Sequence, residues 1–419
     1  MEEIKKVGFI GFGVMSKMYY KYFKNVQVYV HDLPNVLPSI KENYPSVICY
    51  DDPILVARQV DYLIFSVDTK NLEDVVKQVG SSIKVNAIVG GTTSIKQMEI
   101  DLFLKYIPKD VAIITFHSMH GPSVDPKGMP LVVIPYSCTL QQKEMVLALL
   151  APLHSKIVEL ENGDQHDRIT ADTQAVTHVS FMSMGLAWKN QGTYPWKSDL
   201  YAGGIENIKV GFMCRIFNSA WHVYAGLAIS NTNAHLQVRQ YSSSVAQLFQ
   251  LMIEEREEEF RKRIYAAKSF VFKDKKSVLL LNDKVLQQHS LNDKFGIKNN
   301  SHLSLLAIVD SWYTLQIKPY DHLVCETPPF KLWLGIVEYL FCNDTMLENT
   351  IKAALYDKSI RSDDLAFVSA SQNWVQLICT KSYSAYKDQF EDIKTFFGND
   401  KLKDGLNMSS SIIEKLANE

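Results

Sequence analysis

The sequence is poor in the residues that interrupt regular structure, and it has no excess of charge of either sign. Its 419 residues include only 19 glycines and 14 prolines, a low share that argues against an all-β fold. Lysine and arginine total 44 against 46 aspartates and glutamates, whereas proteins that bind nucleic acid usually carry a basic excess. The composition therefore favours a helix-rich protein with no nucleic-acid partner.

Cysteines are few and scattered, and long apolar runs are missing. The six cysteines show neither a C-x-x-C pair nor zinc-ligand spacing, which predicts free thiols in a reducing compartment and no metal site. The most apolar late stretch, Phe330–Phe341, is too short for a bilayer and is interrupted by Lys331 and Glu338. The acidic start, Met1-Glu2-Glu3, does not resemble a signal peptide. We therefore expect a cytoplasmic protein without a membrane segment.

The first 160 residues alternate short β-branched runs with segments of helical spacing, a pattern typical of βαβ units and a mainly parallel sheet. Helical periodicity dominates after about residue 163. We predict an α/β domain at residues 1–162 and an all-α domain at residues 163–419. The predicted strands are Lys6–Ile10, Gln27–His31, Tyr62–Val67, Ala87–Gly90, Val111–Phe116 and Leu131–Ile134. The predicted helices include Asn71–Gly80, Ile95–Tyr106, Asp164–Trp188, Ser242–Phe272, Ser301–Leu315, Phe330–Phe341 and Glu348–Tyr356.

A glycine-rich turn follows the first predicted strand and opens a helix. Gly11 permits a tight turn, and Gly13 lets the backbone approach a pyrophosphate at the helix N-terminus. Ser16 takes the third small position, and Asp32 ends the second predicted strand at the spacing of a ribose-binding carboxylate. The pattern predicts a Rossmann dinucleotide site. Its expected cofactor contacts are Gly11, Phe12, Gly13, Val14, Met15, Asp32, Ser66 and Val67.

Polar residues also follow later strands, at the edge where an open α/β sheet binds its ligands. Ser66 lies at the end of the third predicted strand, Ser94 and Lys96 follow the fourth, and His117 follows the fifth. Histidine titrates near neutral pH, so His117 suits the transfer of a substrate proton. A hydrogen-bonded structural histidine is the alternative interpretation.

Two polar features interrupt the apolar helices of the second half. One is a stripe on a single helix face, which predicts either a cleft lining or an internal polar network; it comprises Asp167, Thr170, Gln174 and His178. The other is Arg215 in an apolar helix, where a planar guanidinium suits bidentate binding of a carboxylate. A structural ion pair is the alternative for Arg215.

The chain resembles the prephenate/arogenate dehydrogenase family, and its fungal (yeast-type) members over nearly the whole length. Segments 169–178, 221–229 and 301–312 carry the resemblance. The family's His-Pro-x-x-Gly motif matches His117 to Gly121, with Ser118 in place of the proline. Its Gly-Ser-Val-Lys motif matches Thr93-Ser94-Ile95-Lys96, and its His-Asp pair matches His166-Asp167.

The resemblance implies roles for individual residues. His117 and Ser94 would be catalytic, and Arg215, which matches the family's Thr-Arg-Ile-Ala motif, would bind a substrate carboxylate. The other expected substrate-binding residues are His178, Lys96 and Gln174. The implied reaction is the oxidative decarboxylation of prephenate to 4-hydroxyphenylpyruvate in tyrosine biosynthesis, without a metal. We also expect a homodimer formed by the apolar helices, and a fungal-type extension over residues 275–419.

Two inferences about the cofactor disagree. A carboxylate at Asp32 normally binds the 2′-hydroxyl of NAD and repels the 2′-phosphate of NADP, and only Lys17 and His31 offer cations nearby. The fungal resemblance nevertheless implies NADP, which we expect because whole-chain similarity is more specific than one residue. NAD is the alternative cofactor. Alternative functions are an arogenate dehydrogenase, a β-hydroxyacid dehydrogenase-like enzyme and a non-catalytic NADP-sensing protein.

Overall fold

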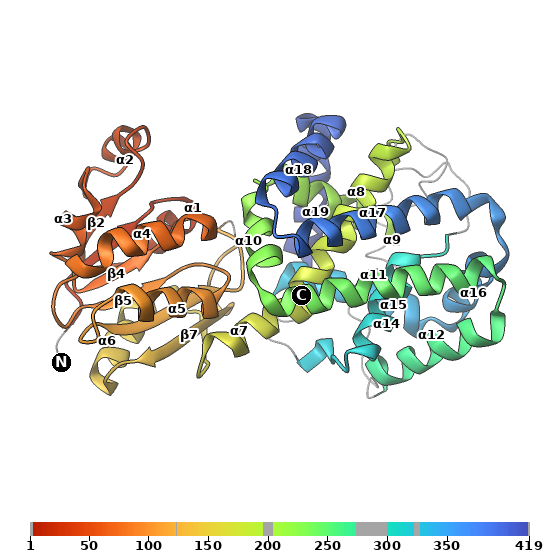
Figure 1. Cartoon of the computed structure of the whole chain (residues 1–419), viewed down its shortest axis with the longest axis horizontal. Coiled ribbons are helices and arrows are strands. Elements are labelled where there is room, and N and C mark those ends of the chain that lie inside the picture. The colour runs from red at the N-terminus through yellow and green to blue at the C-terminus, as the bar shows by residue number, and fades with distance from the viewer. Residues whose placement is uncertain (1–2, 123, 196–203, 274–299, 322–326, 418–419) are drawn as a thin grey trace. The chain divides into compact units, whose positions relative to one another are not determined.

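The computed structural model describes residues 3–122, 124–195, 204–273, 300–321 and 327–417 (Figure 1). The chain divides into two compact units, residues 1–169 and 170–419. This division falls inside a continuous run of helix that begins at Gly163, where we expected the second domain to start. The exact domain limits stay a prediction.

The first unit is built on an eight-stranded sheet with the order β3-β2-β1-β4-β5-β6-β7-β8. All neighbouring strands are parallel except β6 and β7, which confirms the predicted α/β fold with a mainly parallel sheet. The strands are β1 (Lys6–Ile10), β2 (Gln27–His31), β3 (Ile48–Cys49), β4 (Tyr62–Phe65), β5 (Ile88–Gly91), β6 (Ala112–Ser118), β7 (Pro130–Ser137) and β8 (Lys156–Glu159).

The central strands are apolar because helices cover the sheet (Figure 1). All four residues of β4 are fully buried. Helix α4 shows how the helices fit: it buries Leu72, Val76 and Val79 on one face. The helices of this unit are α1 (Val14–Tyr20), α2 (Leu37–Asn43), α3 (Pro53–Ala57), α4 (Leu72–Val79), α5 (Lys96–Tyr106), α6 (Leu140–Leu150) and α7 (Gly163–Thr170).

The second unit is helical, and its helices bury their apolar faces against one another. Trp312, Trp333 and Trp374 lie in this interior, each at most 1% exposed. The helices begin with the π-helical turn η4 (Ala171–Ala175) and continue as α8 (Val176–Asn190), α9 (Ile205–Asn218), α10 (His222–Ser230), α11 (Thr232–Ile253), α12 (Glu257–Phe272), α14 (Leu303–Thr314), α15 (Pro328–Cys342), α16 (Asp344–Tyr356), α17 (Arg361–Cys379), α18 (Tyr383–Phe397) and α19 (Asn399–Ala417).

One segment that we predicted to be a single helix forms two helices. The segment Ser242–Phe272 was expected to be continuous, but α11 ends at Ile253 and α12 begins at Glu257. Glu255 between them has a φ of 51°, a left-handed conformation that a helix cannot continue through. The charged residues of Glu254–Arg263 run across this break and are typical of one solvated helix face, so the sequence gives no sign of the turn.

Three properties of the described residues concern membranes, metals and disulfides. No helix among them is long and apolar enough to cross a membrane. They hold no group of three or more His, Cys, Asp or Glu side chains able to bind a metal. Five cysteines are described and all are free, while Cys325 lies outside the described residues.

Candidate active site

The turn between β1 and α1 has the geometry that close approach of a ligand requires. Gly11 has a φ of 88°, and a Cβ atom there would lie 2.3 Å from the carbonyl oxygen of Ser66. Gly13 precedes α1, and a Cβ there would meet no atom within 4 Å. Helix α1 has no acidic residue in its first turn. The loop backbone therefore borders open space that suits an anionic pyrophosphate.

Among the other residues of this turn, Phe12 and Ser16 are buried, whereas Val14 and Met15 reach the surface. The Ser16 hydroxyl donates a buried hydrogen bond of 2.9 Å to the Gly11 carbonyl, which explains why serine serves as the third small residue. Phe12 is buried against the rings of Tyr20 and Tyr44, so only its backbone can face a cofactor. Val14 is exposed and Met15 is half-buried.

Asp32 is engaged by the backbone on both carboxylate oxygens. The N–H of Phe12 donates to one oxygen at 2.7 Å, and the N–H of Leu33 donates to the other at 2.7 Å. The carboxylate thus links the end of β2 to the glycine-rich turn. The two N–H donors stabilise the negative charge of Asp32 and fix the direction of its carboxylate.

Ser66 and Val67 follow β4 beside the same turn. The Ser66 N–H donates to the Ile10 carbonyl at 2.8 Å, and its hydroxyl shares a 2.8 Å hydrogen bond with that of Thr92. A Cβ on Gly11 would lie 3.1 Å from a methyl of Val67. Both predicted residues therefore border the turn, and their cofactor contacts stay a prediction.

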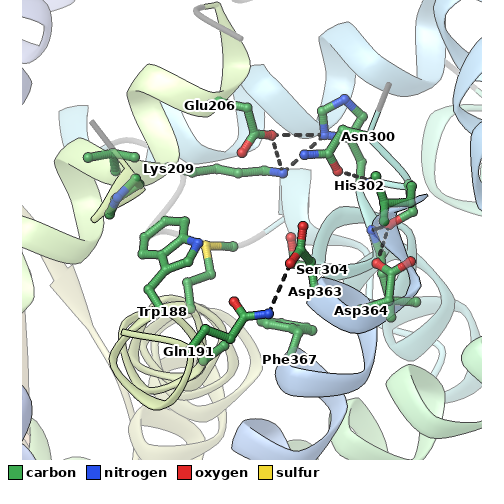
Figure 2. Close-up of a pocket in the computed structure, with 17 residues that line it drawn as sticks. Trp188, Gln191, Glu206, Lys209, Asn300, His302, Ser304, Asp363, Asp364 and Phe367 are labelled. Atoms are coloured by element: carbon green, nitrogen blue, oxygen red, sulfur yellow. Dashed lines mark hydrogen bonds and ion pairs between the residues drawn. The ribbon is translucent and has the colours of Figure 1, made fainter. Parts of the chain in front are cut away.

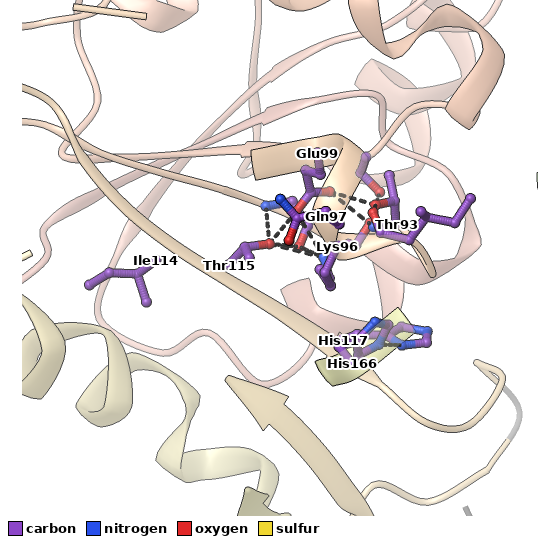
Figure 3. A network of polar contacts seen from close by, with 12 residues as sticks. Thr93, Lys96, Gln97, Glu99, Ile114, Thr115, His117 and His166 are labelled. Atoms are coloured by element: carbon purple, nitrogen blue, oxygen red, sulfur yellow. Dashed lines mark hydrogen bonds and ion pairs between the residues drawn. The ribbon is translucent and has the colours of Figure 1, made fainter. Parts of the chain in front are cut away.

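A buried ion pair fixes the turn between β5 and α5 (Figure 3). Lys96 Nζ donates to the carboxylate of Glu99, the carbonyl of Gly91 and the hydroxyl of Thr115, each at 2.9 Å. Thr93 and Thr115 donate to the same Glu99 carboxylate. Both charged side chains are fully buried, and desolvation lowers the pKa of Lys96.

The prediction that Lys96 binds substrate does not fit this geometry. All three donors of its ammonium group are taken by Glu99, Gly91 and Thr115, and the side chain has no exposed surface. Lys96 is instead a structural residue of the turn that carries Ser94. Ser94 itself is half-buried, and its hydroxyl has no hydrogen-bond partner among the described residues.

His117 lies at the end of β6. It is the first of three side chains joined by hydrogen bonds, of which Figure 3 labels His117 and His166. Its Nδ1 is 2.8 Å from Nε2 of His166, and Nδ1 of His166 is 2.8 Å from Oδ1 of Asp167. Asp167 also accepts the first two N–H groups of α5, from Lys96 at 2.7 Å and from Gln97 at 3.0 Å. One carboxylate, in the middle of α7, therefore joins that helix to the start of α5 and, through His166, to the end of β6.

Burial controls the protonation of His117, His166 and Asp167. Desolvation, aided by the charge of Lys96, holds the pKa of both His117 and His166 well below 6.5, so both imidazoles are neutral at pH 7. Burial raises the pKa of Asp167 to about 6, which leaves its carboxylate ionised at pH 7.

Ser118 replaces the proline of the family motif for a visible reason. Its hydroxyl is buried and shares a 2.6 Å hydrogen bond with the hydroxyl of Tyr19. Tyr19 belongs to α1, so this bond connects β6 to the helix that follows the glycine-rich turn.

In the second unit, one predicted substrate residue lies in a π-helical turn and another lies just after it. Gln174 lies within η4 and His178 lies in the first turn of α8. Such turns are rare and occur often at functional sites. The His178 ring meets the Tyr224 ring edge-on at 4.7 Å, and burial lowers the pKa of His178 to about 4. Neither Gln174 nor His178 has a hydrogen-bond partner among the described residues.

Arg215 lies near the end of α9 and is only partly buried. Its guanidinium forms neither a hydrogen bond nor an ion pair with any described residue, so the alternative of a structural ion pair is not supported. An arginine without a carboxylate partner suits a carboxylate ligand.

The predicted polar stripe has two functions. Asp167 caps α5, and Thr170 accepts a hydrogen bond of 3.4 Å from Asn231, whereas Gln174 and His178 keep their polar groups available. Sequence reasoning gave no role to His166 as a partner of His117, and it overlooked Tyr224. Only tertiary structure reveals these neighbours, because each pair is more than 40 residues apart in the chain.

The second unit also contains a polar cavity of about 120 Å³ (Figure 2). On one side, Lys209 donates to Glu206 at 2.7 Å and lies 3.0 Å from Nδ1 of His302. On another side, Asp364 accepts a 2.5 Å hydrogen bond from Ser301, while its second oxygen is buried without a partner among the described residues. Burial raises the pKa of Asp364 to about 6.

Comparisons with known proteins agree with the resemblance. Residues 175–418 match the family model of a 6-phosphogluconate dehydrogenase C-terminal domain. Prephenate dehydrogenase (NADP(+)) of Saccharomyces cerevisiae is 44% identical, covering 97% of this chain and 95% of that protein. Probable prephenate dehydrogenase (NADP(+)) of Schizosaccharomyces pombe is 42% identical, covering 99% and 98%.

A solved structure shares the fold. Prephenate dehydrogenase from Aquifex aeolicus, in complex with hydroxyphenyl propionate and NAD+, superposes with a TM-score of 0.51 at 14% identity, covering 62% of this chain and 95% of that one. This likeness concerns the fold alone, whereas the yeast relatives match over the full length. The chain belongs to the prephenate dehydrogenase family.

Proposed function

We propose that the chain is an NADP-dependent prephenate dehydrogenase that converts prephenate to 4-hydroxyphenylpyruvate and CO2. The observation that carries the proposal is the placement of His117. A neutral imidazole lies at the end of β6, in the same unit as the glycine-rich turn, with one ring nitrogen engaged by His166 and the other without a partner among the described residues. This is the form of histidine that a general base requires.

NADP+ held at the glycine-rich turn would supply the acceptor for the hydride of the ring carbon that carries the 4-hydroxyl group. His117 takes the hydroxyl proton as that hydride leaves, and Ser94 holds the same oxygen with its available hydroxyl. Loss of the ring carboxylate as CO2 then makes the ring aromatic, and His117 returns the proton to the phenolic oxygen. The products balance prephenate and NADP+ without a further reactant.

The residues of the first turn fit a dinucleotide. The backbone around Gly13 and Val14 would hold the pyrophosphate, because a ligand there meets open space. Lys17, whose ammonium group lies 5.7 Å from the centre of the Tyr44 ring, is a candidate for the 2′-phosphate. With both oxygens of Asp32 engaged by N–H groups, repulsion of that phosphate is reduced.

Substrate recognition is assigned to the second unit. Arg215 would bind a prephenate carboxylate, and His178 and Gln174 would donate or accept hydrogen bonds from the polar groups left available on their helix. Because its pKa is lowered to about 4, His178 is neutral at pH 7 and would contribute a hydrogen bond rather than a charge.

The first experiment compares the wild type with His117→Asn. The variant keeps a polar side chain but loses the base, so kcat with prephenate and NADP+ should fall about 10²–10⁴-fold. The Kd for NADP+, measured by fluorescence quenching, should change little. A variant with a near wild-type rate would show that His117 is not the base.

Two further features of the protein stay proposals. A homodimer is supported by the resemblance. A groove in the second unit contains the apolar residues Phe249, Ile253 and Leu365, but its other lining residues are polar or charged: Glu255, Lys358, Arg361 and Ser362. The apolar helices themselves are covered within the chain, so they do not require a partner. Light scattering at micromolar concentration distinguishes dimer from monomer. The cytoplasmic location is a prediction from the scattered cysteines.

A further inference from the structure

We propose that Asp167 and His166 are positioning residues that fix the tautomer of His117, so that Nδ1 carries the proton and Nε2 is the base. The inference rests on the proposed function for its catalytic meaning, but the tautomer itself follows from the hydrogen bonds together with an ionised Asp167 and a neutral His166. It extends the role of the His-Asp pair beyond a helix start.

The direction of the hydrogen bonds can be derived from the carboxylate outward. An ionised carboxylate only accepts, so the bond of 2.8 Å between Asp167 and His166 requires the proton on Nδ1 of His166. A neutral His166 then has a lone pair on Nε2. Because Nε2 of His166 lies 2.8 Å from Nδ1 of His117, the proton of this second bond must belong to His117. Neutral His117 therefore has its lone pair on Nε2.

The Asp167 end of this series of hydrogen bonds is held rigidly. Oδ1 of Asp167 accepts from both Lys96 N–H and His166, while Oδ2 accepts from Gln97 N–H. Gly163 allows this approach, since a Cβ there would lie 2.4 Å from the Gln97 nitrogen. The side chains of His166 and Asp167 are 0% and 4% exposed, so water cannot reorder these bonds.

The same series of hydrogen bonds, from His117 through His166 to Asp167, supports the proton transfer. When His117 accepts a proton at Nε2, its Nδ1–H bond to His166 strengthens, and the carboxylate of Asp167 lies behind that ring. A carboxylate that orients a catalytic imidazole through one hydrogen bond is known from serine proteases. Here an intervening imidazole transmits the orientation. Asp167 also holds the α5 start, two residues beyond Ser94, so one carboxylate orders both catalytic residues.

The test combines two variants of His166 with a measurement that needs no turnover. His166→Phe keeps an aromatic ring but cannot accept from His117, whereas His166→Gln can place an amide oxygen near the former Nε2. Two-bond ¹⁵N–¹H correlation spectra of histidine-labelled protein report the tautomer of His117, assigned by its loss in His117→Asn.

We expect the Nδ1–H tautomer of His117 in the wild type and in His166→Gln, and its loss or mixing in His166→Phe. The kcat of His166→Phe should fall at least tenfold with KM within threefold, while His166→Gln keeps most of its rate. Asp164→Asn, an exposed change on the same helix, is the matched control and should leave both readouts unchanged.

A wild-type His117 protonated at Nε2 would overturn the proposal even if His166→Phe failed to fold. A His166→Phe enzyme with an unchanged tautomer and rate would overturn it as well. If the spectra show the expected tautomer but prephenate is not oxidised, the positioning chain stands and only the proposed function fails.

Discussion

At the residue scale, what distinguishes the candidate site is which polar groups have protein partners. Lys96 and Asp167 are fully engaged by neighbours, while Ser94, His178 and Arg215 keep groups that no described residue occupies. These three side chains are only partly buried, so a bound substrate can reach their polar atoms, as the proposed function requires.

Arg215→Ala tests this reasoning for the substrate carboxylate. Hydrogen bonds to charged groups contribute about 1.5–3 kcal/mol, so KM for prephenate should rise roughly ten- to a hundredfold. Steady-state kinetics at saturating NADP+ measures the change. Arg239→Ala is the control, because Arg239 is exposed and its guanidinium donates to the thiol of Cys379. Equal KM values for wild type and Arg215→Ala would remove Arg215 from the substrate site.

Asp364 predicts a pH-dependent change in stability. Its pKa is about 6 in the folded protein and about 3.9 when unfolded, so between these values the folded state binds more protons. The free energy of unfolding therefore falls as pH rises from about 4 to 6, and the buried charge remains a cost above pH 6.

Asp364→Asn should remove that cost. The amide oxygen can still accept from Ser301, so we expect the variant to match the wild type near pH 4 and to be roughly 1–3 kcal/mol more stable at pH 7.5. Denaturant unfolding at both pH values measures this, with the exposed Asp388→Asn as control. A variant less stable than wild type at pH 7.5 would mean that the carboxylate has a cationic partner.

At the scale of elements, the sequence predicted the strands and turns whose signal lies within a few neighbouring residues. The bounds of β1 and β2 agree with the predicted strands, because short β-branched runs lie between clear turn signals. The edge strands β3 and β8 were overlooked, since β3 has two residues and β8 is mostly exposed. Likewise, the glycine-rich turn was predictable from spacing, whereas the function of Lys96 depends on Glu99 and Thr115, which only the folded turn brings together.

The β5–α5 turn offers a prediction at this scale. Lys96→Met leaves the buried carboxylate of Glu99 without its cation, which typically costs about 3–5 kcal/mol. The double variant Lys96→Met with Glu99→Gln should recover much of that loss, because no charge remains buried. Lys105→Met, which breaks the exposed pair with Glu73, should cost at most about 1 kcal/mol. Denaturant unfolding would contradict this account if Lys96→Met cost no more than Lys105→Met.

At the scale of the whole molecule, the described part of the predicted C-terminal extension packs against α9. In α18, the Phe390 ring lies 4.8 Å from that of Phe217, and in α19 a Cβ on Gly405 would lie 2.5 Å from the Cβ of Cys214. Both contacts are made with α9, which carries Arg215. The extension therefore supports the element assigned to substrate binding, a role that no sequence motif indicated.

The most direct test of the account is steady-state turnover by the purified chain with prephenate and with arogenate, each with NADP+ and with NAD+. Formation of reduced nicotinamide is followed by absorbance. We predict the highest kcat/KM for prephenate with NADP+, because the chain belongs to a family whose yeast members are named for NADP(+). A tenfold or greater preference for arogenate or for NAD+, or no reduction with either substrate, would contradict it.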